Sequence, residues 1–201
     1  MIQNHELDND IVTVSKLQVA LRSSARSLQS ELTTLTLEAD TETNEGLKSL
    51  LEASALALLR NFEYWTHVLG SSQTISSREE AEMVFNRLSI EERSKFSAET
   101  LSNIDGRIQE RSQIEPDPDE EPAAYIVVTL LLGTADDCPL FEPIDSAEAM
   151  QEALKKVASM SSEYLMVFEL LWSPQVETDT LTEAELATEY GDLVAIASRM
   201  S

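Results

Sequence analysis

The sequence is poor in the residues from which most catalytic and metal sites are built. It contains one cysteine, Cys138, so no intrachain disulfide can form, and a reducing compartment is the natural setting. The two histidines, His5 and His67, lie far apart in the sequence, which argues against the clustered ligands of a structural zinc site. The five glycines form no cluster that could cradle a phosphate. We therefore expect no metal, no nucleotide and no other cofactor.

Positive charge and long apolar runs are scarce as well. The chain has 14 Lys and Arg against 37 Asp and Glu, a formal net charge of −23, which argues against nucleic acid and anionic lipid as direct partners. The first residues, MIQNHELDND, lack the regions of a signal peptide. The apolar stretch at residues 164–172 is far shorter than the ~20 residues that a membrane-spanning helix needs. We expect a soluble chain with no direct membrane insertion.

What the sequence does have is enough apolar residues, 42 % of 201, to fill a core. Residues 1–10 are polar and predict a flexible N-terminal tail. Residues 11–201 then form a single α+β domain, within which three prolines and a run of acids predict an exposed linker at 115–123. This linker could divide the chain into two halves, but the strand-like residues 12–21 need a C-terminal sheet as their partner. We favour one domain.

Strands are predicted where β-branched and apolar residues alternate or run together, and helices where apolar residues recur every three or four positions. The predicted strands are residues 12–21, 64–76, 124–135 and 164–172. The last of them is nearly all apolar, which indicates a central or near-central position. It would be parallel to residues 124–135 if the two were neighbours, and an intervening strand is the alternative. We predict a small mixed sheet of about three to four strands, with helices packed mainly on one face.

Helix starts are marked by side chains that cap free backbone N–H groups. A Ser, Thr or Asp followed three residues later by Glu is the signature of a capping box, and Thr43 is a simple N-cap. We interpret the Glu residues of these pairs as structural rather than catalytic. The predicted boxes are Ser76 with Glu79 or Ser77 with Glu80, Ser89 with Glu92, Asp145 with Glu148, and Thr182 with Glu185.

Glu169 is the acid with the most unusual setting, because it interrupts the apolar run LMVFELLW. Strict alternation would place Leu165, Val167, Glu169 and Leu171 on one face of the strand. An unpaired buried carboxylate is costly, so we expect Glu169 to lie near an edge, to meet a cation or a backbone donor, or to be protonated. The simpler reading is a partly exposed position on the less covered face.

His67 and Cys138 complete the candidates for a site. His67 stands beside Trp65, and a packed or surface histidine is the simpler interpretation of it. Cys138 lies in the loop-like sequence TADDCPLF without a recognisable base, so we expect a partly buried, inert thiol. We assign no catalytic, cofactor-binding or metal-binding residue, and keep Glu169, His67 and Cys138 as candidates under an enzymatic alternative.

Several stretches resemble domain-of-unknown-function family 1517 of cyanobacteria and chloroplasts. The similarity is carried by YIVVTLLLGTA, by IDSAEAMQEALKKVASMSSEYLMVFELLWSPQ and by DTLTEAEL, with weaker matches such as LALLRNFEYWTHV in the N-terminal half. The combination of ELLWSPQ with DTLTEAEL is the most specific part. The resemblance implies a role in photosynthetic acclimation to fluctuating light, and it implies no catalytic residues. Many members of the family resemble membrane-attached proteins with an upstream hydrophobic segment, whereas here Met1 stands ten residues before the first predicted strand.

We therefore expect a non-enzymatic regulatory or protein-interaction module of the cyanobacterial cytosol, with peripheral association with thylakoids as a further alternative. Its partner would be an unidentified protein. The rival hypothesis is an enzyme or small-ligand binder with a site in a cleft beside the sheet, which requires an acid with a displaced pKa. A third alternative is a homo-oligomeric structural protein with a large self-complementary apolar patch.

Overall fold

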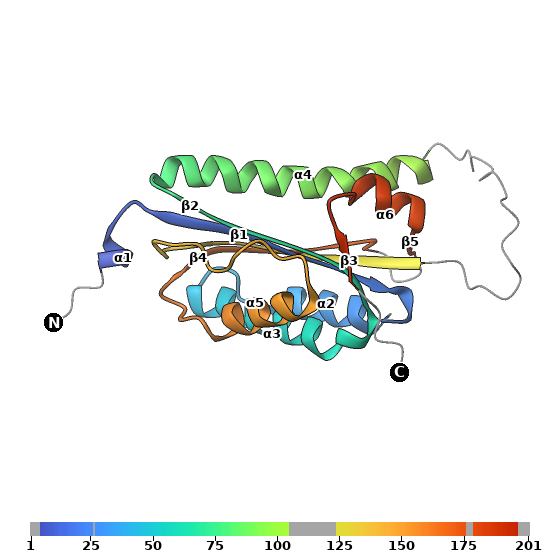
Figure 1. Ribbon diagram of the computed structural model, residues 1–201, viewed down its shortest axis with the longest axis horizontal. Coiled ribbons are helices and arrows are strands. Elements are labelled where there is room, and N and C mark those ends of the chain that lie inside the picture. Colours follow the sequence, from blue (N-terminus) through green and yellow to red (C-terminus); the bar gives the residue numbers. More distant parts are fainter. Residues whose placement is uncertain (1–4, 26, 105–123, 176–178, 197–201) are drawn as a thin grey trace, which may run out of the picture.

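The computed structural model describes residues 5–25, 27–104, 124–175 and 179–196, and the predicted linker at 115–123 lies outside these residues. The described residues form an α+β arrangement of one sheet with helices on it (Figure 1). The strands are β1 (Val12–Arg22), β2 (Trp65–Ile75), β3 (Ala124–Thr134), β4 (Leu165–Ser173), β5 (Leu181–Thr182) and β6 (Val194–Ala195). The helices are α1 (His5–Asp8), α2 (Ser27–Glu38), α3 (Asn44–Arg60), α4 (Arg78–Ile104), α5 (Ala147–Ser159) and α6 (Glu183–Glu189), with short 3₁₀ turns at Ser23–Ala25 and Phe62–Tyr64.

The sheet is larger than predicted and is not mixed. In the described part it has six strands, with the order β4-β3-β1-β2-β6 and β5 paired to β3, and every pairing between strands is antiparallel. The four long strands correspond to the four predicted segments. The other two contain two residues each, too few to give a periodic signal in the sequence. Strands from both halves of the chain lie in one sheet, with β1 and β2 between β3 and β6.

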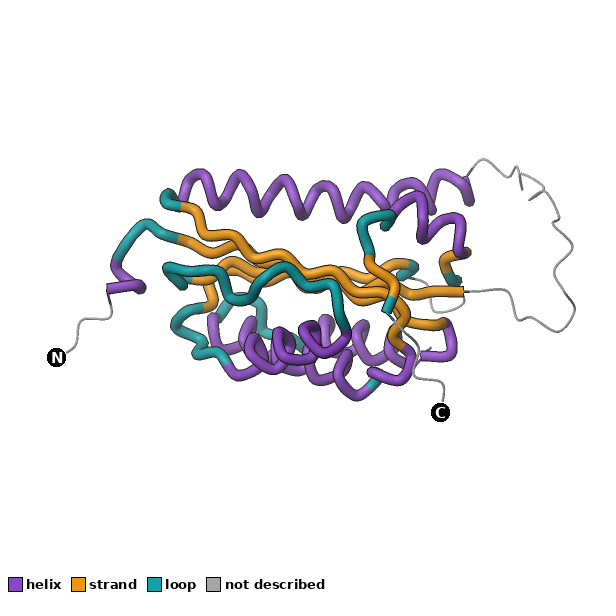
Figure 2. Tube along the Cα trace, in the orientation of Figure 1, coloured by secondary structure: helices purple, strands orange, loops and turns teal. Residues whose placement is uncertain are grey.

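Helices cover both faces of the sheet rather than mainly one. Figures 1 and 2 show α2, α3 and α5 below the sheet and α4 with α6 above it. The layer below buries the larger apolar core, to which β1 contributes Leu17, Val19 and Leu21. The layer above is necessary because β1 and β3 also carry buried apolar residues of the opposite parity, such as Val14 and Leu131.

β4 is an edge strand, so the prediction of a central strand was wrong. Its neighbour is β3, and it lies at one end of the strand order. Its apolar length is explained by cover on both faces, from α3 below and in part from α4 above. The register shifts between Gly133 and Thr134, where Val167 and Leu165 are the successive partners and Met166 is the extra residue. This bulge turns Leu165 into the core below the sheet, so the strict alternation predicted for it fails.

β3 and β4 are antiparallel neighbours, neither parallel nor separated by another strand. The reason lies in the segment that follows β3, which crosses to β2 before α5 brings the chain back to the end where β3 finished. Where this segment crosses β2, Ile144 N donates to Gly70 O at 3.0 Å. A Cβ on residue 70 would lie 2.5 Å from Ile144 Cδ1, so this crossing requires glycine in β2.

Most predicted helix starts are present. Thr43 and Thr182 cap α3 and α6, the latter in a complete capping box with Glu185, and Ser77 Oγ accepts from Glu80 N at 3.3 Å. Two predictions were wrong. Ser146, not Asp145, is the N-cap of α5. Ser89 and Glu92 start no helix, because α4 continues through them.

Residues 5–9, which belong to the predicted tail, form a short helix and contact the rest of the chain, while residues 1–4 lie outside the described residues. Residues 5–8 form α1, and Tyr164 Oη donates to Glu6 Oε2 at 2.7 Å. Asn9 Nδ2 donates to Asp137 Oδ1 at 2.8 Å, and Arg78 donates to Asn9 O at 2.9 Å. The chain before β1 is therefore tied to the ends of β2, β3 and β4.

Candidate functional site

Charged and polar side chains gather between α4 and the sheet, at a depth where apolar packing would be expected. Apolar residues near the start of the helix, including Ala81 and Phe85, pack on the sheet. Farther along, the contact becomes polar. We call this set the α4 polar cluster and define it by Lys16, Gln18, Ser89, Glu92, Arg93, Lys95, Thr129 and Glu169.

Glu92 is the buried centre of the cluster, with its side chain only 2 % exposed. Its Oε1 accepts from Lys16 Nζ at 3.2 Å. Its Oε2 accepts from Gln18 Nε2 at 2.8 Å and from Lys95 Nζ at 2.9 Å. Gln18 Nε2 also donates to Thr129 Oγ1 at 2.9 Å. Two cations and an amide therefore hold one carboxylate, as a buried charge requires.

Glu169 forms the second ion pair of the cluster, on the edge strand β4. Its Oε2 accepts from Ser89 Oγ at 2.7 Å, and its Oε1 accepts from Arg93 Nη2 at 3.0 Å. The Glu169 side chain is 23 % exposed and that of Arg93 is 59 % exposed. The predicted setting, a partly exposed position near an edge with a cation beside it, describes this environment.

Simple periodicities bring these side chains together. Lys16 and Gln18 belong to the face of β1 that also carries Val14 and Ala20, because residues two apart in a strand point the same way. On α4, Ser89, Glu92 and Lys95 are three residues apart and share one side of the helix. Lys95 Nζ also lies 4.3 Å from the centre of the Tyr190 ring, which joins the cluster to the end of α6 by a cation–π contact.

His67 lies elsewhere, beneath α6 on β2. Its ring packs edge-on against Tyr125 with 5.9 Å between the ring centres, and Nδ1 lies 2.9 Å from Thr66 Oγ1. Burial lowers the pKa of His67 below its ordinary value, and the negative charge of Glu183 opposes this shift. Burial and then Glu183 raise the pKa of Tyr125, which Arg22 partly offsets. The enzymatic alternative requires a displaced pKa in an acid beside a cleft, and His67 and Tyr125 supply displaced pKa values in a histidine and a tyrosine.

Cys138 is exposed, so the prediction of a partly buried thiol was wrong. It lies in the loop that follows β3, and its main-chain oxygen accepts from Thr13 Oγ1 at 3.1 Å. The loop is held at the surface by its backbone, which leaves the thiol outside the core.

The three sequence candidates are not brought together. Glu169 is level with Leu131 and Lys16 across the sheet, whereas His67 pairs with Ala20, four residues farther along β1. Four residues in a strand span ~13 Å, and three strand spacings separate β4 from β2 by a further ~14 Å. Cys138 lies beyond the opposite end of β3. No single reaction centre can use all three.

The α4 polar cluster can hold the helix on the sheet, and its ionic groups are already paired with one another. Within the described residues, no three His, Cys, Asp or Glu side chains are placed to hold a metal ion. The sequence did contain a signal for the cluster, since Lys16 and Gln18 interrupt the apolar face of β1. Their partner Glu92 and the residue Ser89, which donates to Glu169, were predicted to form a capping box, because a box and one side of a continuing helix share the same spacing.

Comparison with known proteins identifies the fold's relatives. The family model described as a protein of unknown function, DUF1517, matches residues 11–196, which include every strand of the sheet. The chain belongs to the DUF1517 family. The earlier resemblance is thereby confirmed.

Two named relatives of this DUF1517 chain come from photosynthetic organisms. "Protein FLAP1 homolog A" of Synechocystis is 38 % identical over 190 residues, covering 90 % of this chain and 56 % of the relative. "FLUCTUATING-LIGHT-ACCLIMATION protein 1, chloroplastic" of Arabidopsis thaliana is 39 % identical over 183 residues, covering 91 % of this chain and 46 % of the relative. The chain thus spans about half the length of these relatives.

No solved structure matches the DUF1517 chain. Among the described residues, no helix has the length and apolar character needed to cross a bilayer.

Proposed function

We propose that this chain is a non-enzymatic regulatory module that acts through contacts with another protein during acclimation to fluctuating light. The names of the two relatives support the biological setting. We place the module in the cyanobacterial cytosol or peripherally at the thylakoid surface. A net charge of −23 disfavours direct adsorption to anionic lipid, so attachment to a membrane would go through a protein.

The observation that carries this proposal is the mutual pairing of the buried ionic groups. A general acid or base needs a carboxylate that can exchange a proton with a substrate. Glu92 instead accepts from Lys16, Gln18 and Lys95 at the base of α4. Glu169 accepts from Ser89 and Arg93. These contacts hold both carboxylates in ion pairs and hydrogen bonds within the protein, and they position a helix.

The enzymatic alternative keeps one specific support, the His67–Tyr125 pair beneath α6. Both groups have displaced pKa values, and Glu183 lies close enough to influence both. An acid–base role would require a substrate to enter beside α6 and reach the His67 ring.

A rescue experiment separates the two functions. In Synechocystis lacking FLAP1 homolog A, we expect this chain to restore growth and fluorescence responses under fluctuating light. A variant combining His67→Gln, Tyr125→Phe and Cys138→Ala should rescue equally if the role is non-enzymatic, once thermal unfolding confirms that it is folded. Rescue by the unaltered chain but not by the folded triple variant would support the enzyme, and no rescue by either would oppose the proposed setting.

A further inference from the structure

The sheet has one long edge on which the described residues place no neighbouring strand. β4 pairs with β3 along one side and ends the strand order. A strand edge of this kind presents main-chain N–H and C=O groups that a further strand can bind. The opposite end of the sheet differs, because β2 is paired there with β6 at His67 and Val68 and forms a bridge with Ile144 at Gly70, which interrupts its outer edge.

Exposure along β4 limits where such a strand could bind. Met166 and Val167 are 38 % and 36 % exposed, and both are large apolar side chains. Glu169 and Leu170 are half-buried, whereas Leu171 to Ser173 are buried. The bulge at Met166 ends the regular ladder on its N-terminal side. Within residues 166–170 only Phe168 is buried, because its side chain points into the core below the sheet, and we call this stretch the β4 edge segment.

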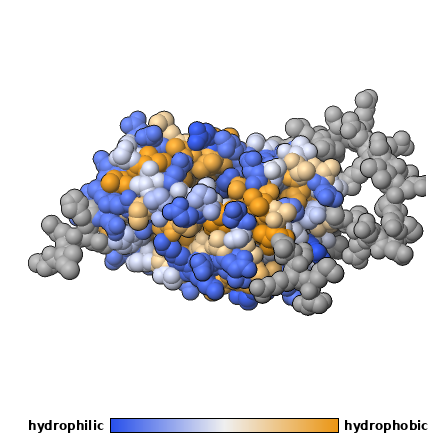
Figure 3. All heavy atoms as spheres, viewed as in Figure 1, coloured by the Kyte–Doolittle hydropathy of each residue, from blue (hydrophilic) through white to orange (hydrophobic). Residues whose placement is uncertain are grey.

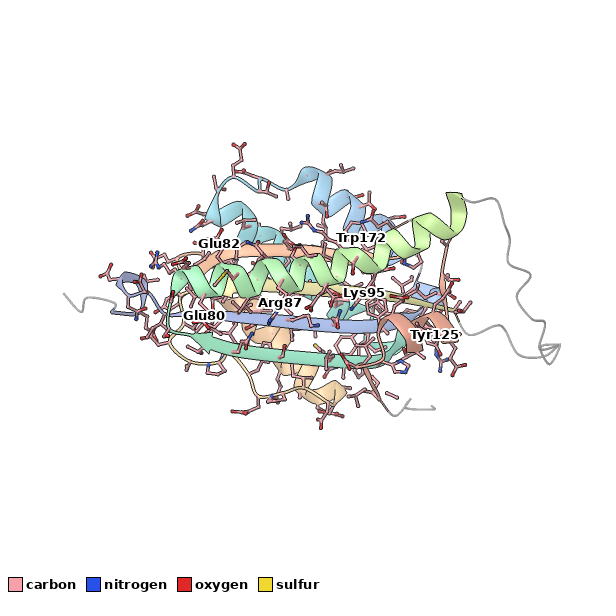
Figure 4. All side chains as sticks on the ribbon, turned by 90° about the horizontal axis from the view of Figure 1, so that it is seen from above. Glu80, Glu82, Arg87, Lys95, Tyr125 and Trp172 are labelled. Carbon is pink, nitrogen blue, oxygen red and sulfur yellow. The ribbon has the colours of Figure 1, made fainter. Side chains whose placement is uncertain are left out.

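Acidic side chains surround the β4 edge segment. Glu163 is exposed just before β4. Glu6 lies near the start of β4, because Tyr164 Oη donates to its carboxylate. Figure 4 shows Glu82 on the side of α4 that faces β4, with Glu80 on the opposite side. The neighbouring cation, Arg93, is already paired with Glu169. The local charge, like the net charge of the chain, is negative.

We propose that the β4 edge segment accepts an added strand from a partner protein, and that this strand is extended and cationic. The main-chain groups of β4 would supply the pairing, and alternate Lys or Arg side chains would face Glu82 and Glu163. A second copy of this chain is disfavoured as the occupant, because it brings the same charge of −23 to the same acidic edge. This inference rests on the proposed role as a protein-interaction module and specifies the chemistry of its partner.

The test uses a fluorescent peptide of alternating lysine and valine, as long as β4, and measures fluorescence anisotropy with the full chain. A second peptide has the same sequence with N-methyl groups on alternate residues, which blocks one hydrogen-bonding edge and leaves the charge unchanged. We expect binding of the first peptide and at least about tenfold weaker binding of the second, because strand addition depends on main-chain hydrogen bonds.

Variants locate the binding edge. Val167→Lys should weaken binding about tenfold or more, since it places a cation in a cationic interface and Lys protects strand edges from pairing. Val194→Lys is the matched control, because Val194 is 39 % exposed on β6 at the other end of the sheet, and it should leave the affinity within about twofold. Met166→Lys provides a second edge variant if Val167→Lys unfolds.

Each outcome decides the matter. Equal binding of the two peptides, equal effects of the Val167 and Val194 variants, or no binding would overturn strand addition at β4. A dimer in light scattering that Val167→Lys dissociates would assign the edge to a second copy instead, which also overturns the proposal. If the Val167→Lys variant does not bind the peptide yet rescues growth like the unaltered chain, the β4 edge segment has no part in the function. If the unaltered chain itself fails to rescue growth, the proposed function is opposed.

Discussion

On the face covered by α2, α3 and α5, β1 presents Leu17, Val19 and Leu21, whereas on the face covered by α4 it presents Lys16 and Gln18. The same strand therefore contributes to a dry apolar layer and to an ionic one. Apolar contacts stabilise in proportion to the area that they bury and are not directional. Paired charges add little net stability but are costly to leave unpaired, so they fix how a helix lies on a sheet.

The surface is consistent with this division. Figure 3 shows hydrophilic residues over the outer sides of both helix layers, with hydrophobic residues visible mainly in the band between them. The isolated exposed apolar residues of α4, Met83 and Ile90, are 62 % and 68 % exposed. The exposed apolar residues of α4 therefore do not form a continuous apolar outer face.

The largest loss of stability should follow from damage to the apolar face. Leu58 of α3 is fully buried, so Leu58→Ala should lower the free energy of unfolding by about 3 kcal/mol through lost burial and a cavity. Urea unfolding provides the measurement. Leu56→Ala is the control on the same helix, because Leu56 is 41 % exposed and should cost less than about 1 kcal/mol. Similar losses at both positions would contradict the assignment of the core.

On the ionic face, removal of the central charge should cost somewhat less. Glu92→Gln keeps the shape but leaves Lys16 and Lys95 without a carboxylate, and we expect a loss of about 2–3 kcal/mol in the same urea experiment. Glu91→Gln removes a 56 % exposed partner of Arg87 and should cost less than about 0.5 kcal/mol. Equal losses of unfolding free energy from Glu92→Gln and Glu91→Gln would contradict a stabilising role of the buried ion pairs at α4.

A smaller effect is expected at the start of α5 in the apolar layer. Ser146 Oγ accepts from Ala149 N, so Ser146→Ala should destabilise the chain by about 1 kcal/mol. Asp145→Ala removes the neighbouring carboxylate, which does not cap the helix, and should cost less than about 0.5 kcal/mol. Thermal unfolding of the two variants provides the measurement. A larger loss from the Asp145 variant than from Ser146→Ala would contradict Ser146 as the N-cap of α5.

The smallest effect concerns His67 beneath α6. Its folded pKa is lowered from 6.5, so the folded chain binds fewer protons at this site than the unfolded chain, and acid favours unfolding. This contribution is fully present above pH 6.5 and declines as the pH falls from there through the folded pKa. In His67→Gln, the melting temperature should fall less steeply with acidification over this range, whereas His5→Gln should follow the unaltered chain. Parallel curves for all three proteins would exclude a titrating role for His67.

The features that could be predicted from the sequence are those that depend on local periodicity. Alternation and β-branched runs located the four long strands, and capping side chains such as Thr43 and Thr182 located helix starts. The position of β4 could not be predicted in this way. An edge strand covered on both faces has the same apolar composition as a central one.

The candidate site was less predictable because its contacts are distant in sequence. Glu92 meets residues of β1 that lie 74 and 76 positions earlier, and Glu169 meets Ser89 across 80 positions. A Ser followed by Glu three residues later fits both a helix start and one side of a continuing helix. The environment of Glu169 could be anticipated from the cost of burying a charge, but the identity of its partners could not.

The length of α4 has a consequence for how the molecule opens. The helix contacts β1, β2, β3 and β4, and beyond the apolar contacts of Ala81 and Phe85 it is held by ion pairs and hydrogen bonds that water can replace. Local openings of a protein follow the segments with the least buried apolar contact. The amide protons of α4 should therefore exchange with solvent sooner than those of β1 and β3. We therefore expect α4 to open from the sheet while the apolar layer on the other side stays intact.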